Sequence, residues 1–126
     1  MATTNTGMAE MSGLVGNTGS KTAFTYLAVG TGTTAFAVTQ TELVTEITDT
    51  GLARAAATVS QTQTTVSDDT LQLQYTWTAS GSKTLGEIGV FNGSSGGTMG
   101  WRQVLSPAKA LTNGSDYTAI VQIAFS

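Results

Sequence analysis

The chain has 126 residues, of which five are basic and eight acidic, a formal net charge of −3, and neither cysteine nor histidine. This length fits one domain with its own hydrophobic core. The absence of cysteine excludes disulfides and thiolate metal sites, and the absence of histidine removes the usual general base near neutral pH, so most metalloenzyme and hydrolase classes are excluded. The basic residues are scattered singly, and we therefore expect no nucleic-acid partner.

Membrane and small-molecule partners are not indicated either. The first twenty residues lack a basic start followed by an apolar run, and no stretch approaches the ~18 apolar residues of a membrane helix. We expect a protein made in the cytoplasm with no membrane partner. No motif suggests a cofactor, a metal or a small-molecule substrate, and we expect none.

Residues 1–20 are rich in Gly, Thr, Ser, Asn and Met without a sustained period, which predicts a flexible N-terminal arm preceding one domain over 21–126. Two interpretations are open. The arm is a terminus without a partner, or it docks on a neighbouring subunit through Met8, Met11, Leu14 and Val15.

A first strand is predicted over 24–29, and it stops at Gly30-Thr31-Gly32, which we interpret as a turn and not a phosphate cradle because no third glycine or lysine follows. The one predicted helix runs from Thr39 to about Ile47. Thr39 and Glu42 have capping-box spacing there, and Leu43 lies four residues before Ile47.

The rest of the chain reads as strands and turns, the clearest strand being Thr70 to Ala79, where apolar and polar residues alternate without a break. Before it, a long strand over 52–66 bends partway. Asp68 and Asp69 between these strands form a solvated turn, since no further oxygen ligands follow at calcium-loop spacing. Later strands are predicted over 85–91, 98–105 and 117–125. Pro107 is expected to end the second of them.

Short strands with frequent turns predict an all-β fold, an antiparallel β-sandwich or, alternatively, a flattened barrel, with one short helix and an extended N-terminal arm. Each one-sided sheet must bury its apolar face against a second layer. The expected core comprises Phe24, Tyr26, Leu43, Ile47, Leu71, Leu73, Tyr75, Trp77, Ile88, Val90, Trp101, Val121, Ile123 and Phe125.

Four residues around the glycine-rich loop 92–97 are candidate site residues. Phe91 and Trp101 flank this loop and either anchor a subunit contact or fill the interior. Glu87 and Arg102 are single charges in apolar strands, and we interpret them as a structural cross-strand ion pair. A catalytic carboxylate is the alternative for Glu87, but it lacks a second acid and an activated nucleophile.

Several strings of residues suggest a family. They are Phe-Thr-Tyr-Leu-Ala-Val-Gly-Thr-Gly-Thr-Thr-Ala over 24–35, Gly-Leu-Ala-Arg-Ala-Ala-Ala-Thr-Val over 51–59, Glu-Ile-Gly-Val-Phe-Asn over 87–92, Gly-Gly-Thr-Met over 96–99 and Arg-Gln-Val over 102–104. Together they resemble a widespread group of small structural proteins of tailed bacteriophages. The resemblance covers most of residues 22–126, implies a virion component and carries over no catalytic residues.

The resemblance and the chemistry favour a non-enzymatic capsid decoration or cement protein that stabilises the outer surface of the shell by binding it. The expected partners are the major capsid protein and further copies of the chain, with a trimer as one arrangement. The arm and the Gln/Thr faces of the strands would carry the contacts. The alternative is a tail, neck or fibre-associated component, and an enzyme is the third and least supported interpretation.

Overall fold

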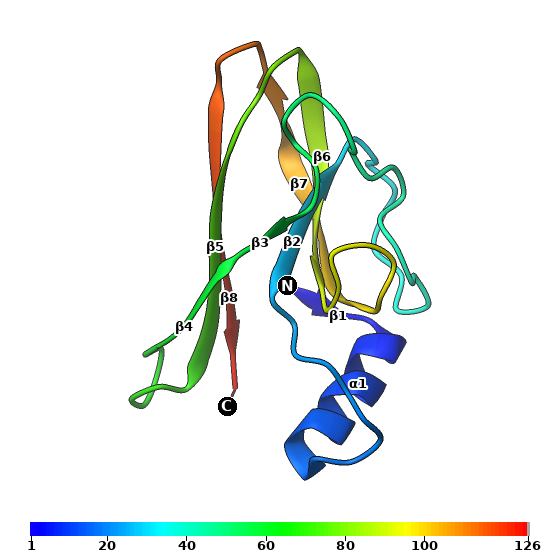
Figure 1. The fold of residues 1–126 in the computed structure, drawn as a ribbon, viewed down its shortest axis with the longest axis vertical. Coiled ribbons are helices and arrows are strands. Elements are labelled where there is room, and N and C mark those ends of the chain that lie inside the picture. The colour runs from blue at the N-terminus through cyan, green and yellow to red at the C-terminus, as the bar shows by residue number, and fades with distance from the viewer. Residues whose placement is uncertain (126) are drawn as a thin grey trace.

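The computed structural model of the protein describes residues 1–125, which form two antiparallel sheets and one helix (Figure 1). The all-β sandwich predicted from the sequence is confirmed. One sheet has the order β1-β7-β6-β2-β3 and the other the order β4-β5-β8. The elements are β1 (Ala2–Thr3), α1 (Asn5–Gly16), β2 (Tyr26–Gly30), β3 (Ala55–Ala56), β4 (Thr58–Thr62), β5 (Thr70–Thr78), β6 (Lys83–Phe91), β7 (Met99–Leu111) and β8 (Asp116–Ala124).

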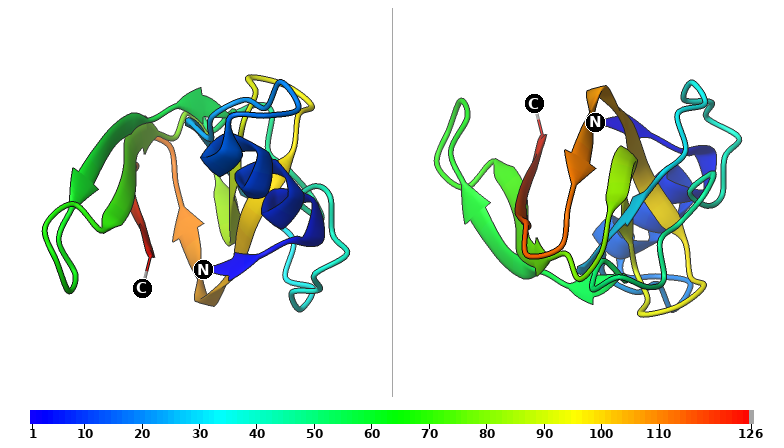
Figure 2. Two further views of the ribbon diagram at one scale, coloured as in Figure 1. Left: turned by 90° about the horizontal axis from the view of Figure 1, so that it is seen from below. Right: turned by 90° about the horizontal axis from the view of Figure 1, so that it is seen from above.

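The alternating sequences of β5 and β8 give the three-stranded sheet one apolar and one polar face. Their register places Leu73 opposite Val121 and Trp77 opposite Tyr117, so the apolar side chains of both strands face the other sheet. The outer face carries polar pairs instead, such as Gln72 beside Gln122 with their side-chain amides 2.9 Å apart. Figure 2 shows the two sheets as separate layers viewed from either end.

The predicted bend within 52–66 corresponds to a change of sheet. β3 pairs with β2 in the five-stranded sheet, whereas β4, only one residue further along, pairs with β5 in the other. Ala57 lies between them. The segment therefore closes one side of the sandwich without an intervening turn.

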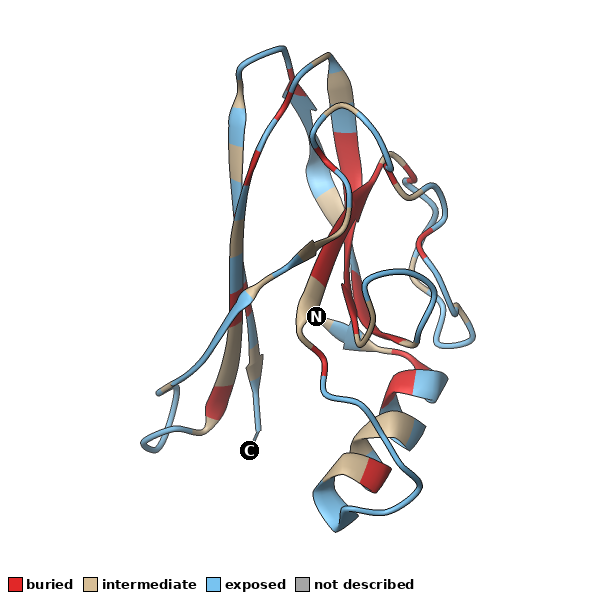
Figure 3. Cartoon of the chain, viewed as in Figure 1, coloured by how far each residue is buried: buried red, intermediate tan, exposed pale blue. Residues whose placement is uncertain are grey.

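Burial is concentrated on β2 and β6, at the centre of the five-stranded sheet (Figure 3). Most of the core expected from the sequence is buried, including Trp77, which is 2% exposed. Tyr26, Leu71, Tyr75 and Ile123 are half-buried. Phe125 is 55% exposed, so its assignment to the core was wrong: β8 runs past the end of the opposite sheet, and the last apolar side chain has little to cover it.

The helix predicted over 39–47 is also wrong. This segment is a loop of turns and bends that runs beside β2, with Thr31 N–H donating to Thr45 O and Ile47 N–H to Val29 O. Leu43 and Ile47 are still buried, at 4% and 3% exposed. Hydrogen bonds to the neighbouring strand take the backbone groups that a helix would use, so tertiary contacts override the local capping pattern.

The helix lies instead at Asn5–Gly16, within the segment assigned to the N-terminal arm. Thr4 is its N-cap, accepting a hydrogen bond from Gly7 N–H, and Asn17 ends it in the left-handed conformation. β1 precedes it and pairs with β7. The first sixteen residues thus contain regular structure bound to the domain, while the flexibility of residues 1–20 stays a prediction.

Pro107 does not end its strand as the sequence suggested, because β7 continues to Leu111. The pairing of β6 with β7 shifts between Glu87↔Val104 and Leu85↔Lys109. Pro107 lies in the resulting bulge. A bulge does not require the N–H that proline lacks, so the strand resumes after it.

Candidate interaction surface

Helix α1 is fixed to the end of the sandwich by its first residues. The buried Thr4 hydroxyl donates to Met99 O, and Thr4 N–H donates to Gly100 O at 2.9 Å. The same hydroxyl accepts from Gly7 N–H at 2.9 Å and so caps the helix. One side chain therefore begins the helix and attaches it to β7.

Two further contacts fix the direction of α1. A Cβ on Gly7 would lie 2.5 Å from the carbonyl oxygen of Gly100, so the helix backbone approaches β7 as closely as glycine allows. One turn further on, the Glu10 carboxylate accepts hydrogen bonds from Thr22 N–H at 3.1 Å and Asn92 Nδ2 at 3.2 Å. α1 is consequently held at the end of the sandwich where β8 also ends (Figure 1).

Between α1 and this end of the sandwich lies an apolar groove of about 240 Å³. Its wall on the helix side is Met11, Leu14 and Val15. The remaining lining comes from both sheets and the segment before β2: Ala23, Phe24, Thr25, Val59, Leu71, Trp101 and Phe125. We call these ten residues the end groove.

The end groove has a rigid aromatic floor and an exposed apolar rim. Phe24 and Trp101 form the floor, packed edge to face with ring centroids 5.0 Å apart. On the rim, Val15 is 90% exposed and Phe125 55%. Among the described residues, no ionisable side chain lines the groove. Its chemistry is therefore that of a site for an apolar side chain or segment of another molecule.

The structure brings together four of the six residues predicted for interaction: Met11, Leu14, Val15 and Trp101 all line the end groove. Met8 is on α1 and 49% exposed, but it is not part of the lining. Phe91 is buried in a separate small cluster with Ala28, Leu43 and Met99. Phe91 and Trp101 are 1% and 2% exposed, so both belong to the interior, and only Trp101 also borders the groove.

The groove residues that the sequence analysis did not assign to interaction come from β4, β5, the segment before β2 and the residue after β8. Val59 looked like one position in a long strand, and Phe125 like the last inward residue of an alternating one. Only the relative placement of β4, β8 and α1 turns them into a common surface. Alternation within each strand carries no signal for that placement.

The Glu87–Arg102 ion pair predicted from the sequence is present, and it is fully buried. Arg102 Nε lies 2.8 Å from Glu87 Oε1, and both side chains have no exposed area. The two residues are not directly opposite, because Arg102 pairs with Gly89 and Glu87 with Val104. They meet diagonally across β6 and β7.

Glu87 also holds the loop between β2 and β3. Its carboxylate accepts from the backbone N–H groups of Gly32 at 3.1 Å, Val44 at 2.9 Å and Thr45 at 2.7 Å. Burial acts to raise the pKa of Glu87, but hydrogen bonds from Thr45, Arg102 and Val44 outweigh it and the pKa is lowered. With all these donors aimed at it, the carboxylate is a structural anchor and is not placed to act as a general base.

A second arginine, which the sequence analysis noted only as an isolated charge, organises the glycine-rich loop. The Arg54 guanidinium lies 3.6 Å from the centre of the Phe91 ring, and its Nη2 forms an ion pair with Glu46 Oε1 at 2.8 Å. It also donates to the carbonyl oxygens of Gly93 and Gly96. No spacing in the sequence relates these residues, so nothing there could have revealed the contact.

Over residues 1–125, no three His, Cys, Asp or Glu side chains lie close enough to hold a metal ion. In the same range, no helix has the length and apolar character needed to cross a membrane. The features that the described residues do assemble are an apolar groove and a buried ion pair. The described residues thus define a small, charge-poor β-sandwich with an apolar groove at one end.

Comparison with protein families makes the assignment more specific. The model of the family described as podophage GP4 fiber I protein gp80 matches residues 5–123. The chain belongs to this family and is a structural protein of a phage virion, in agreement with the resemblance seen in its sequence. No curated protein and no solved structure matches the chain.

Proposed function

We propose that this chain is a fibre-associated structural subunit of a tailed phage and that it acts by binding a partner protein through the end groove. The observation that carries the proposal is the family match over residues 5–123, which includes α1 and every strand except β1 and the last residue of β8. The family is named for a fibre protein. The matched residues 5–123 include every residue of the end groove except Phe125.

The groove is suited to assembly because its floor is preformed. Phe24 and Trp101 are already packed against each other, so a partner side chain would bury its surface without reordering them. A single leucine- or phenylalanine-sized side chain that becomes fully buried contributes about 1.5–3 kcal/mol. Such a contact, repeated over several subunits of a virion, gives stable attachment by multivalency, with no catalytic step.

Capsid decoration, which the sequence favoured, is the second candidate. It is supported by the outer face of β5 and β8, where polar, uncharged side chains such as Gln72 and Gln122 offer hydrogen-bonding groups to a protein lattice. The expected partner would then be the major capsid protein. The fibre assignment agrees at least as well with the family and requires no shell partner.

The test is to locate the chain on intact particles. The chain has no cysteine, so Ser94→Cys on the exposed 92–97 loop provides a single attachment site for a maleimide-linked gold particle. Particles carrying this variant would be imaged by electron cryomicroscopy, with particles of the unmodified chain exposed to the same reagent as the control.

Gold at the tail and its fibres, in few copies per particle, would support the fibre assignment. Gold distributed over the shell in many copies would support decoration and contradict it. Particles that lack the chain altogether would contradict both candidates.

A further inference from the structure

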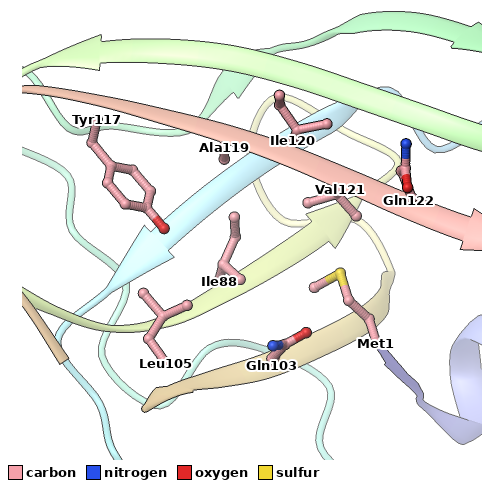
Figure 4. A pocket seen from close by; sticks show the side chains of 9 residues that line it. All are labelled: Met1, Ile88, Gln103, Leu105, Tyr117, Ala119, Ile120, Val121 and Gln122. Carbon is pink, nitrogen blue, oxygen red and sulfur yellow. The ribbon is translucent and has the colours of Figure 1, made fainter. Parts of the chain in front are cut away.

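Two pockets outside the end groove differ in their chemistry. One, of about 210 Å³, lies between β8 and the five-stranded sheet and is lined mainly by apolar side chains such as Ile88, Leu105 and Val121 (Figure 4). The other, of about 300 Å³, lies beside the glycine-rich loop 92–97 and presents a carboxylate and three hydroxyl groups. The second pocket therefore has the groups with which a polar small molecule is recognised.

This polar pocket, which we call the loop pocket, is lined by Glu46, Thr48, Ala53, Arg54 and residues 94–96. The first four residues belong to the loop between β2 and β3, and the others to the loop between β6 and β7. Two loops that are far apart in the sequence thus build one site.

Arg54 holds the two loops together and fixes the shape of the pocket. Its Nε and Nη2 donate to the two carboxylate oxygens of Glu46 at 3.1 and 2.8 Å. Its Nη1 donates to Gly93 O at 2.9 Å and to Gly96 O at 2.8 Å. Only 8% of the Arg54 side chain is exposed. The pocket is consequently formed before a ligand arrives, which lowers the ordering cost of binding.

The loop pocket offers both donors and acceptors to a ligand. Within residues 1–125, the hydroxyls of Thr48, Ser94 and Ser95 make no hydrogen bond, and neither do the backbone N–H groups of Ser94 and Ser95. All three residues are exposed. Each oxygen of Glu46 accepts one bond from Arg54 and retains a further lone pair.

The charges of the pocket argue against an ionic ligand. Glu46 is its one acid and is already neutralised by Arg54, and no three His, Cys, Asp or Glu side chains of the described chain lie close enough to hold a metal ion. An anion would meet the Glu46 carboxylate. Arg54 would attract it little, because four of the five guanidinium N–H groups are engaged. A neutral ligand with many hydrogen-bonding groups fits best.

We propose that the loop pocket binds a neutral saccharide. A sugar hydroxyl donates and accepts at once, so it can donate to Glu46 while it accepts from the N–H groups of Ser94 and Ser95. The C–H groups of the ring can pack against the Ala53 methyl group. A volume of about 300 Å³ is at the lower end for small-molecule sites and suits one sugar ring. The inference does not depend on the end groove or on the place of the chain in the virion.

The test is a nuclear magnetic resonance titration of the isotope-labelled full chain with glucose, galactose, mannose, rhamnose and N-acetylglucosamine. We expect at least one of them to cause saturable shifts of the backbone amides of residues 46–54 and 93–97. A parallel titration with dextran, a neutral polysaccharide, distinguishes the two sources of such a ligand. Tighter binding of dextran than of glucose indicates a polysaccharide chain, and weaker or equal binding indicates a free sugar.

A pair of double variants shows whether the pocket hydroxyls carry the binding. Thr48→Val with Ser95→Ala removes two of them and is expected to weaken binding at least about fivefold. Thr34→Val with Ser82→Ala makes the same changes at exposed positions outside the pocket and should leave the affinity unchanged. Dispersed amide spectra would show that both variants are folded.

Three results would overturn the proposal. The first is the absence of shifts with all five sugars and with dextran. The second is equal sugar affinity of the two double variants. The third is a response of the same amides to inorganic phosphate or calcium chloride in place of the sugars.

Discussion

Arg102 lies two residues away from Val104, the residue of β7 that pairs with Glu87, and its Nε donates to Glu87 Oε1 at 2.8 Å. Neither side chain is exposed. Glu87 in turn accepts from three backbone N–H groups of the loop between β2 and β3. The ion pair is therefore the point at which a loop without helix or strand is attached to the sheet. This loop contributes Leu43 and Ile47 to the core.

Glu87→Gln is expected to lower the free energy of unfolding by about 3–5 kcal/mol, because it leaves the buried Arg102 charge without its counterion. Urea denaturation at neutral pH measures the loss. Glu42→Gln, an exposed acid in the same loop, is the matched control and should change stability by less than about 0.5 kcal/mol. Equal stability of the two variants would mean that the buried pair contributes nothing.

Replacing both partners of the pair should not restore stability here. A buried ion pair can often be exchanged for apolar residues at little cost. In this chain, Glu87→Leu combined with Arg102→Met would leave the N–H groups of Gly32, Val44 and Thr45 without their acceptor. We expect the double variant to remain markedly less stable than wild type in the same urea titration. Full recovery would show that the loop does not depend on Glu87.

Stability should fall in acid because of Glu87. Its pKa is lowered from 4.5 in the folded state, so the unfolded chain binds a proton more readily. The stabilisation that the ionised Glu87 carboxylate contributes is fully present above pH 4.5 and is lost as the pH falls below that value. Asp69, whose pKa backbone hydrogen bonds from Val66 and Thr64 hold well below its usual range, acts in the same direction.

The two contributions can be separated by comparing wild type with Glu87→Gln between pH 7 and pH 3. Asp69 titrates in both proteins, so any difference between the slopes of their unfolding free energies against pH reports Glu87 alone. We expect the variant to lose less stability than wild type over this range. Parallel curves would contradict the assigned role of the carboxylate.

Gly7→Ala should destabilise the protein even though alanine favours helices by roughly 1 kcal/mol over glycine. The added Cβ would lie 2.5 Å from Gly100 O. Neither atom can move away unless the backbone shifts. Gly16→Ala is the control within the same helix, where the nearest atom is Thr18 Cγ2 at 3.7 Å. Thermal unfolding should show a lower Tm for the first variant and an unchanged or higher Tm for the second.

The sandwich could be predicted because alternation in 70–79 and 117–125 directly reflects the two faces of β5 and β8. The ion pair could be predicted because Glu87 and Arg102 are single charges in apolar strands. The helix could not be placed. Asn5–Gly16 contains three glycines and a weak pattern, and its stability comes from contacts such as Thr4 with Met99 and Gly7 with Gly100.

The end groove was predicted only in part for a related reason. Met11, Leu14 and Val15 could be suspected as apolar residues in a polar segment. Val59 and Phe125 belong to the groove only because two strands of one sheet end beside a helix attached to the other sheet. Such a surface depends on how elements lie relative to one another, and sequence periodicity does not encode that.

The measurement that most directly tests binding through the end groove is incorporation of variants into particles. Val15→Lys places a charge on the rim at a position that is 90% exposed, and Val38→Lys makes the same change at an exposed site outside the groove. Each variant would be supplied to a phage lacking the chain, and its amount in purified particles determined by quantitative mass spectrometry. We predict that Val15→Lys is strongly depleted while Val38→Lys matches wild type; equal incorporation of all three would contradict the account.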